Sequence, residues 1–244
     1  MKVLVTGSTS KIGILLCQAL LTQNHQVVAY DIKQSGIKHE RLISVTADVR
    51  DFERLTRAAR GCDTGIHLAI LAGESSSIEL AGVNVVGAYA FFQAARQNKF
   101  RNAVLASSAP VHLPPGPADH AIINESGKND LYDLTKTLQE VIAQDFHLHG
   151  SPTMCIRFGH VVLGAQGINL DEHIPLAKLD YCRGGWVAIE DVVSACVAAM
   201  SVEPDQDFTI YNLVGSRSGR DRFNTAATER RLGISLQYDF SAYE

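Results

Sequence analysis

Short apolar runs alternate with amphipathic segments along the first two thirds of the chain. Short runs rich in apolar and β-branched residues predict strands over residues 2–6, 26–30, 42–46, 64–68, 103–107 and 153–158, the first of them buried on both faces. Apolar residues three and four apart predict helices over residues 12–21, 52–59, 78–97 and 131–147. Because parallel strands need crossover connections, this alternation predicts an α/β fold with a doubly wound parallel sheet.

Two stretches lack this periodicity. Residues 112–127 are rich in proline, and residues 162–185 contain four glycines. Each stretch follows a predicted strand, so we expect both to lie over the carboxyl edge of the sheet, where open α/β folds bind ligands. They are therefore candidate substrate loops or lids.

The composition is that of a globular protein with one main core. Of 244 residues, 46% are hydrophobic and 20% are charged, which excludes a disordered or coiled-coil chain. The net charge is -4, and no window gathers lysine and arginine as a nucleic-acid surface would. We therefore expect no nucleic-acid partner.

The sequence carries no visible signal for export or membrane insertion. The chain starts directly with an apolar strand, and no apolar run approaches the roughly 18 residues that a membrane span requires. Five cysteines are scattered, without a pair at metal-ligand spacing. We therefore expect a soluble, cytoplasmic protein without a membrane partner or a metal site.

The turn between the first strand and the first helix is rich in small residues: residues 6–13 read TGSTSKIG. Such a turn lets the backbone approach a diphosphate, whose charge the helix N-terminus stabilises. In isolation, Gly7 and Gly13 equally well permit a tight turn and close helix packing. Asp31 favours ligand binding, because it ends the second strand 18 residues beyond Gly13, where a carboxylate accepts hydrogen bonds from the ribose of a dinucleotide.

The same carboxylate repels a 2′-phosphate, so Asp31 favours NAD over NADP. Lys11 in the turn and Lys33 just beyond the acid have the charge to pair with that phosphate. The predicted cofactor is therefore NAD, with NADP left open.

Tyr132 and Lys136 form a second constellation, on the predicted helix over residues 131–147. They lie four residues apart on one helix face, so the ammonium is placed beside the phenol and favours the phenolate. Ser108 ends an earlier strand and can hydrogen-bond a substrate oxygen while Tyr132 exchanges its proton, as hydride transfer at a carbinol or carbonyl needs. Ordinary amphipathic helices also carry this spacing, so the joint occurrence of the motifs decides between the two interpretations.

Taken in order, the motifs resemble those of the extended short-chain dehydrogenase/reductases, the NAD-dependent epimerase/dehydratase family. That family has a T-G-x-x-G-x-x-G turn, an acid at the end of the second strand, an Asp-hydrophobe pair after the third strand, and a Ser-Ser segment before Y-x-x-x-K. The matching positions here are residues 6–13, Asp31, Asp48 with Val49, Ser107 with Ser108, and Tyr132 with Lys136, with further likenesses at residues 67–69, 84–87, 157–164 and 186–193. The resemblance covers essentially residues 1–202.

The resemblance implies a Rossmann-like sheet with a small C-terminal substrate-binding lobe. Residues 1–160 are the expected dinucleotide-binding core, and residues 161–244 a short substrate-binding segment that completes the same domain. In the implied Ser-Tyr-Lys mechanism, Tyr132 is the general acid/base, Lys136 holds the nicotinamide ribose and Ser108 orients the substrate. The residues expected at the cofactor are Gly7, Ser10, Lys11, Ile12, Gly13, Asp31, Asp48, Val49, Leu68, Ala69, Ile70, Ser107, Tyr132 and Lys136, and those expected at the substrate are Ser108, His112, His160 and Arg183.

Three positions depart from the family pattern. Ser10 replaces the middle glycine of the turn, which puts the cofactor affinity in question. His112 and His160 stand where the family usually has a tyrosine and often an asparagine, which leaves the substrate open.

The likeness is strongest to uronate dehydrogenases, which oxidise a free sugar acid at C1 with NAD. About 80 residues follow Arg157, fewer than a full lobe over a nucleotide diphosphate needs, which favours a small substrate. Arg183 or Lys178 is the expected partner of a substrate carboxylate, although both equally suit solvated loop positions.

We therefore expect an NAD(P)-dependent oxidoreductase acting on a small polar, sugar-derived substrate. One alternative is a nucleotide-sugar epimerase or dehydratase that reduces and reoxidises NAD within one cycle. Another is a non-catalytic NAD(P)-binding regulator, against which the presence of both Tyr132 and Lys136 argues. By analogy with the family, the helices over residues 78–97 and 131–147 pair across a two-fold axis in a homodimer.

Overall fold

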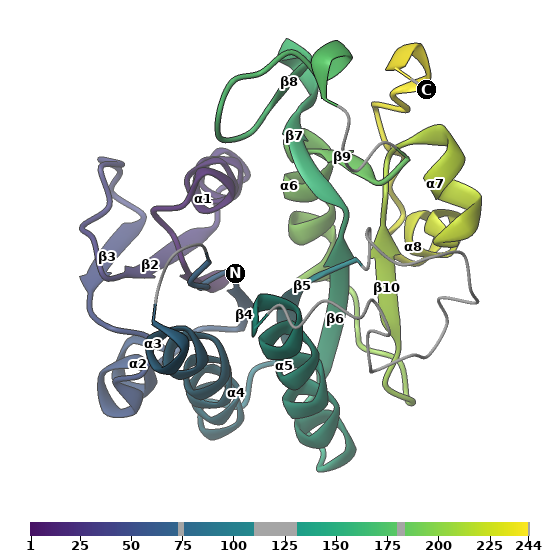
Figure 1. The fold of residues 1–244 in the computed structure, drawn as a ribbon. Coiled ribbons are helices and arrows are strands. Elements are labelled where there is room, and N and C mark those ends of the chain that lie inside the picture. Colours follow the sequence, from purple (N-terminus) through teal and green to yellow (C-terminus); the bar gives the residue numbers. More distant parts are fainter. Residues whose placement is uncertain (73–75, 110–130, 180–183, 244) are drawn as a thin grey trace.

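A seven-stranded parallel sheet forms the centre of the molecule (Figure 1). The structure, a computed structural model, describes residues 1–72, 76–109, 131–179 and 184–243. Side by side, the strands are β10 (Ile210–Leu213), β6 (Thr153–Phe158), β5 (Asn102–Ser108), β4 (Thr64–His67), β1 (Lys2–Thr6), β2 (Gln26–Asp31) and β3 (Leu42–Thr46). Every neighbouring pair is parallel, which confirms the predicted doubly wound, Rossmann-like sheet.

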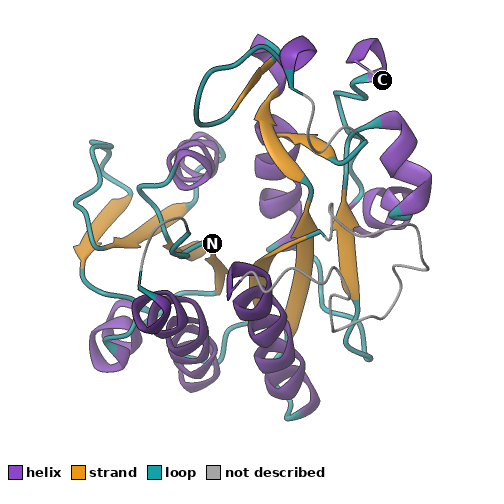
Figure 2. Ribbon diagram, viewed as in Figure 1, coloured by secondary structure: helices purple, strands orange, loops and turns teal. Residues whose placement is uncertain are grey.

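Helices cover both faces of this sheet (Figure 2). One face carries α1 (Lys11–Thr22) and α6 (Ile189–Ala199), and the other carries α2 (Phe52–Ala58), α4 (Gly87–Gln97) and α5 (Leu131–Leu148). Along β1, Val3 and Val5 pack under the first layer, whereas Leu4 between them packs under the second. Strands β1, β2, β5 and β6 are mostly apolar because both of their faces are buried, whereas the edge strand β3 is partly exposed.

The helix predicted over residues 78–97 is continuous but contains a wider turn. It consists of α3 (Ser77–Ala81), the π-helical turn η1 (Gly82–Val86) and α4. Its 21 residues are long and apolar enough to cross a membrane, so the expectation that no segment comes near this length is wrong. Half of its most apolar stretch is buried within the fold, where Phe91 and Phe92 belong to the core, and this packing accounts for the apolar residues on its buried side.

A second, three-stranded sheet forms where the sequence shows no periodicity. Its strands are β8 (Ile168–Asn169), β7 (His160–Leu163) and β9 (Trp186–Ala188), in that order, with the short 3-10 turns η2 (Gly164–Gln166) and η3 (Leu176–Lys178) between them. Strands of two to four residues are too short to show a repeat, which is why the sequence analysis predicted none of them. In Figure 1 this small sheet lies beyond the carboxyl ends of the central strands.

The last part of the chain contributes both to the central sheet and to the periphery. After β10 come α7 (Arg217–Arg222), α8 (Thr225–Leu232) and η4 (Ser241–Tyr243). The carboxylate of Asp191 on α6 accepts hydrogen bonds from the amides of Gln237 and Tyr238 at 2.8 and 3.3 Å, which holds the C-terminal segment against the fold. There Phe240 packs edge-on against the buried Trp186.

Candidate active site

Two adjoining hollows lie along the carboxyl ends of the central strands. The hollow lined by Asp31, called here the Asp31 hollow, has a volume of about 600 Å³, and the hollow lined by Tyr132, the Tyr132 hollow, one of about 760 Å³. Ser10, Leu68 and Ile70 line both, so the two hollows share a wall. The chain order of the strands reverses between β1 and β4 directly beneath this wall, which is where open α/β sheets bind ligands.

The glycine turn between β1 and α1 lies at this wall. Gly7 has a φ of +71°, and a Cβ there would lie 2.6 Å from the amide nitrogen of Ala69. A Cβ at Gly13 would lie 2.2 Å from the carbonyl oxygen of Gly7. Only glycine therefore lets the turn, the N-terminus of α1 and the loop after β4 approach so closely, and this arrangement of amides fits a dinucleotide diphosphate.

Ser10, in place of the usual middle glycine, is accommodated without backbone strain. It is the N-cap of α1 with φ −67° and ψ 163°, its side chain accepts a hydrogen bond from the Gly13 amide at 3.0 Å, and its hydroxyl donates to the Gly7 carbonyl at 2.8 Å. The serine therefore stabilises the turn, but it also engages one of the amides at the helix N-terminus.

Asp31 is fixed between the turn and β2. Its carboxylate accepts hydrogen bonds from the backbone amides of Thr9 at 2.9 Å and Lys33 at 3.1 Å. Lys33 lines the Asp31 hollow, whereas Lys11 lines the Tyr132 hollow, where its ammonium contacts the Leu170 carbonyl and lies 3.3 Å from the Asp171 carboxylate. Of the two lysines considered for a 2′-phosphate, Lys33 therefore lies on the same side as Asp31, and Lys11 does not.

Asp48 and Val49 also line the Asp31 hollow, together with Arg50, which the sequence analysis did not single out. The Arg50 guanidinium donates to Asp48 Oδ1 at 2.9 Å, and this hydrogen bond lowers the pKa of Asp48 against the opposing effect of burial. The same guanidinium lies 3.5 Å from Glu79 on α3. In the sequence, the only indication that Arg50 lies at this hollow was its position two residues after Asp48.

Ser108, Tyr132 and Lys136 all line the Tyr132 hollow. Lys136 is buried, and its ammonium donates a hydrogen bond to the carbonyl oxygen of Ala106 at 2.8 Å. Burial lowers the pKa of Lys136 to about 8, while the negative charge of Glu140 acts in the opposite direction. The fold thus brings the three predicted catalytic residues to one hollow, which the turn binding the expected diphosphate also borders.

Ser107 lies beside Ser108 but engages a different set of groups. Its hydroxyl donates to the Glu140 carboxylate at 2.5 Å, and Glu140 also forms a two-fold hydrogen-bonded ion pair with Arg157, at 2.8 and 2.7 Å. All three side chains are buried. The sequence analysis missed the role of Glu140, although it lies four residues beyond Lys136 on the same helix face.

Asn84 ties the wall of the hollows to α5. Its side-chain oxygen accepts from the Leu71 amide at 2.7 Å, and its side-chain nitrogen donates to the Leu71 carbonyl at 3.0 Å and to the Thr135 hydroxyl at 2.9 Å. Thr135 in turn donates to the Tyr132 carbonyl at 2.9 Å. Asn84 lies on the π-helical turn η1, a feature common near functional sites.

Each of the remaining predicted residues either lines one of the two hollows or lies outside the described residues. Ile12 and His160 line the Tyr132 hollow, and Ala69 lines the Asp31 hollow. His112 and Arg183 lie outside the described residues.

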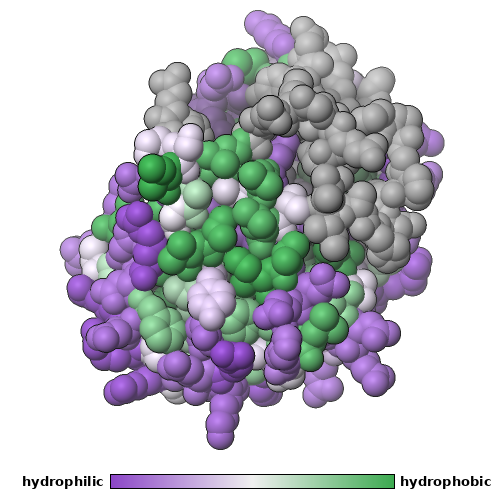
Figure 3. Space-filling model, turned by 60° about the horizontal axis from the view of Figure 1, so that its bottom comes forward, coloured by the Kyte–Doolittle hydropathy of each residue, from purple (hydrophilic) through white to green (hydrophobic). Residues whose placement is uncertain are grey.

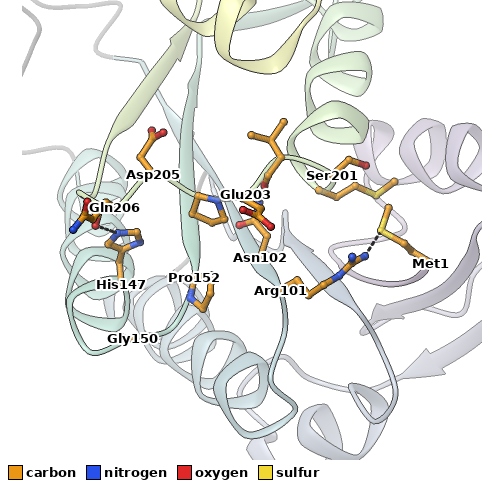
Figure 4. A pocket seen from close by; sticks show the side chains of 13 residues that line it. Met1, Arg101, Asn102, His147, Gly150, Pro152, Ser201, Glu203, Asp205 and Gln206 are labelled. Atoms are coloured by element: carbon orange, nitrogen blue, oxygen red, sulfur yellow. Dashed lines mark hydrogen bonds between the residues drawn. The ribbon is translucent and has the colours of Figure 1, made fainter.

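A further hollow of about 620 Å³ lies at the opposite edge of the sheet (Figure 4). Asn102 at the start of β5 and Pro152 just before β6 line it, together with Arg101, His147 and Glu203. The side-chain amide of Asn102 donates to two backbone carbonyls there, at 2.8 and 3.0 Å, so it closes the loop after α6. Of the predicted site residues that the structure describes, none lines this hollow, and it lies away from the carboxyl ends of the strands.

Comparison with known proteins finds similar sequences and similar structures. Residues 3–213 match the model of the NAD-dependent epimerase/dehydratase family. A probable UDP-glucuronate 4-epimerase from Rhizobium meliloti is 29% identical over 65% of this chain and 52% of its own length, so the chain spans about half of that relative. L-arabinose 1-dehydrogenase (NAD(P)(+)) from Haloferax volcanii is 24% identical over 95% of this chain and 94% of its own length.

Solved structures share the fold at lower sequence identity. A mutated uronate dehydrogenase superposes with a TM-score of 0.76 at 22% identity, over 99% of this chain and 83% of that one. MoeE5 in complex with UDP-glucuronic acid and NAD superposes with a TM-score of 0.78 at 20% identity, over 98% of this chain and 95% of that one.

Proposed function

The chain belongs to the NAD-dependent epimerase/dehydratase family, and we propose that it is a dehydrogenase acting on a hydroxyl or carbonyl carbon of a small polar, sugar-derived substrate. As a member, it is an NAD-dependent enzyme of the short-chain dehydrogenase/reductase type. The observation that carries the proposal is the common hollow: Ser108, Tyr132 and Lys136 line the space that adjoins the glycine turn and the Asp31 hollow.

The residues around the two hollows suit NAD. The turn at Gly7 and Gly13 would hold the diphosphate at the N-terminus of α1, and Asp31 would accept hydrogen bonds from the adenosine ribose. Asp48 and Val49 would flank the adenine in the same hollow. When bound, NAD supplies the hydride acceptor, or in its reduced form the hydride donor, of the reaction.

The side chains of the Tyr132 hollow would handle the proton. Tyr132 is the proposed general base in the direction of oxidation: its phenolate oxygen takes the hydroxyl proton of the substrate. The Lys136 ammonium favours that phenolate by its charge, and Ser108 would hold the substrate oxygen by a hydrogen bond. His160, Arg183 and His112 are proposed at the substrate, and residues 161–244 are proposed to form its binding segment.

A free sugar or sugar acid is the proposed substrate class. The chain aligns over nearly the full length of the L-arabinose 1-dehydrogenase and superposes over 83% of the uronate dehydrogenase. A pentose or a uronic acid is small enough for the Tyr132 hollow, while the dinucleotide would also extend into the Asp31 hollow. A uronic acid would additionally require a cation for its carboxylate, for which Arg183 is proposed.

A panel of substrates tests this function directly. Free uronic acids, aldoses and UDP-sugars would be incubated with NAD or NADP, and reduced nicotinamide would be followed by its absorbance. We expect steady accumulation of NADH with a free sugar or sugar acid. No reduction with any member of the panel would contradict the proposal.

Nucleotide-sugar epimerisation is the second candidate. It is favoured by the superposition on MoeE5, which covers 95% of that chain and has UDP-glucuronic acid and NAD bound. The same panel separates the two candidates, because an epimerase converts its UDP-sugar without net accumulation of NADH. The converted sugar would be detected by chromatography.

We further propose a homodimer that forms through the outer face of α3, α4 and α5. Large apolar side chains are exposed there: Ile78, Val86, Tyr89, Leu134, Leu138 and Val141. Figure 3 shows these helices from outside, with hydrophobic side chains gathered over the centre of the face. Such a patch suits a partner surface of the same kind, and the same helices of a second copy provide one.

We also propose a cytoplasmic location. Cys17, Cys62, Cys155 and Cys196 are free thiols buried in the described part of the chain, as a reducing compartment allows.

A further inference from the structure

A buried ion pair lies directly behind the proposed catalytic lysine. Arg157 on β6 donates from Nε and from its terminal nitrogen to the two oxygens of Glu140 on α5, at 2.8 and 2.7 Å. Ser107, which faces Arg157 in the register of β5 and β6, donates a third hydrogen bond to the same carboxylate at 2.5 Å. The side chains of Arg157 and Glu140 are 7% and 5% exposed, so solvent contributes little to either charge.

Stability alone is a weak reason for such a pair. Two charges lose their hydration on burial, and well-packed apolar residues of the same volume often stabilise a core as much or more. On the same face of β6 the side chain of Cys155 is fully buried in the core cluster that includes α5, so the pair lies in the interior of the fold. The position of the ion pair relative to Lys136 and Tyr132 therefore suggests what its role is.

Glu140 lies one helical turn beyond Lys136, and Lys136 lies one turn beyond Tyr132. A lysine and a glutamate four residues apart on a helix readily pair with each other. Here the Glu140 carboxylate is turned instead to Arg157 and Ser107, and the Lys136 ammonium donates to the Ala106 carbonyl. One carboxylate thus lies within reach of two cations, and the bidentate geometry of the guanidinium commits it to Arg157.

We propose that Arg157 and Glu140 are positioning residues: their ion pair keeps the Glu140 carboxylate away from the Lys136 ammonium, so that the ammonium serves Tyr132 and the cofactor. This inference rests on the proposed function of Lys136. Among the residues that the structure describes, the titratable or charged groups around Lys136 include Glu140 on α5, His67 on β4, and Cys155 and Arg157 on β6, and Tyr132 and Asp133 on α5 line the same hollow. Of these, Glu140 is the carboxylate that would compete for the ammonium if Arg157 were removed.

Three variants separate an electrostatic role from a merely structural one. Arg157→Met leaves the Glu140 carboxylate without its counter-charge, Glu140→Gln leaves the guanidinium without one, and the double variant removes both charges. Ser107→Ala is the matched control, because it removes a hydrogen bond from the same carboxylate but no charge. The protein without cofactor is labelled with carbon-13 at the lysine ε-carbon, and the Lys136 resonance is assigned by its absence from Lys136→Met.

The readout is the pH midpoint of Lys136, followed by nuclear magnetic resonance. We expect the midpoint to rise by about one pH unit in Arg157→Met, because a nearby unpaired carboxylate favours the ammonium, and to fall by a similar amount in Glu140→Gln. The double variant and Ser107→Ala should stay within about 0.3 units of the wild type. Midpoints that move in the same direction in both single variants, or that do not move, overturn the inference.

The same variants are then assayed with the substrate identified by the panel. Arg157→Met should lower kcat about tenfold or more and change KM little, and the double variant should recover part of kcat, since the competing carboxylate is gone. If Arg157→Met does not fold, the inference is judged from the other two variants: the midpoint should fall in Glu140→Gln and stay near the wild type in the double variant, and equal midpoints would overturn it. The titration requires no turnover, so a failure of the proposed dehydrogenase activity is recognised separately, by an inactive wild type.

Discussion

The backbone amide of Thr9, in the glycine turn, donates a hydrogen bond to the Asp31 carboxylate at 2.9 Å. This bond links the turn to the end of β2, and it directs the negative charge of Asp31 into the Asp31 hollow. In Asp31→Asn the side-chain oxygen can still accept from Thr9, while the charge that repels a 2′-phosphate is gone. We expect the preference for NADH over NADPH to fall about tenfold, or 1.4 kcal/mol in relative binding free energy.

Fluorescence titration with NADH and with NADPH measures this preference. Asp63→Asn is the matched control, because Asp63 also accepts from a backbone amide, that of Lys2, but lies at the opposite edge of the sheet. An unchanged ratio in Asp31→Asn would mean that Asp31 serves the turn and not cofactor selection.

Tyr132→Phe tests the proposed acid/base residue. The variant keeps the aromatic ring in the Tyr132 hollow and loses the hydroxyl that would exchange the proton. We expect kcat to fall by about 100-fold or more, with the dissociation constant of NADH changed less than about threefold. Tyr89→Phe on the outer face of α4 is the control, and equal turnover in Tyr132→Phe and in the wild type would end the assignment.

The strands and helices of the central sheet were predictable because each follows from the pattern of apolar residues within its own segment. The runs 2–6 and 153–158 are mostly apolar, as strands covered on both faces usually are, and they are strands in the structure; their charged exceptions are Lys2 and Arg157. The same periodicity located α1 and α5 to within a residue or two. By contrast, β8 has two residues and β9 three, and their pairing with β7 depends on residues brought together by the rest of the fold.

The candidate site was predictable where a motif is contiguous and unpredictable where partners come from distant segments. Tyr132 and Lys136 are four residues apart, so their shared helix face follows from the sequence. The partners of Glu140 come from two other strands, at Ser107 and Arg157, and no local pattern indicates that they meet. Likewise, only the fold shows that Lys11 lies beside Asp171, 160 residues away.

His67 makes the stability of the fold depend on pH. Burial, followed by the charge of Lys136, lowers the pKa of His67 from 6.5 to about 3. Between these values the unfolded chain binds a proton that the folded chain does not, so the free energy of unfolding decreases as the pH falls below 6.5. The contribution is about 1.4 kcal/mol for each pH unit in this window.

Urea unfolding at pH 7, 6 and 5 would show this dependence. In His67→Asn, which removes the titrating ring, we expect the decrease between pH 6 and pH 5 to be smaller by about 1 kcal/mol. His149→Asn is the control, because the side chain of His149 is 67% exposed. Equal slopes in the wild type and in His67→Asn would contradict the buried, neutral state of His67.

The apolar face on α4 and α5 predicts how the oligomeric state responds to a single charge. Leu134 and Val141 are 53% and 42% exposed there. A carboxylate placed on this face would lose its hydration on association without gaining a partner, so we expect Leu134→Asp and Val141→Asp to be monomeric and the wild type to form the proposed dimer. Light scattering after gel filtration measures the mass, and Ile43→Asp, exposed at 53% on the edge strand β3, is the control.

The contact between Lys11 and Asp171 joins the glycine turn to the segment after β8 and allows a last prediction. Both side chains are largely exposed, at 49% and 82%, so their pairing adds little to stability, and Asp171→Asn should unfold at the same temperature as the wild type. It would, however, leave the charge of Lys11 unneutralised at the N-terminus of α1, where the diphosphate is proposed to bind. We expect NADH to bind about threefold more tightly to Asp171→Asn at low salt, and this gain to disappear as salt screens the lysine.

Asp145→Asn, which removes an exposed carboxylate of α5 beside His149, is the matched control for Asp171→Asn. Weaker binding of NADH by Asp171→Asn would reverse the interpretation, because the contact would then hold the segment after β8 in a position that the cofactor needs.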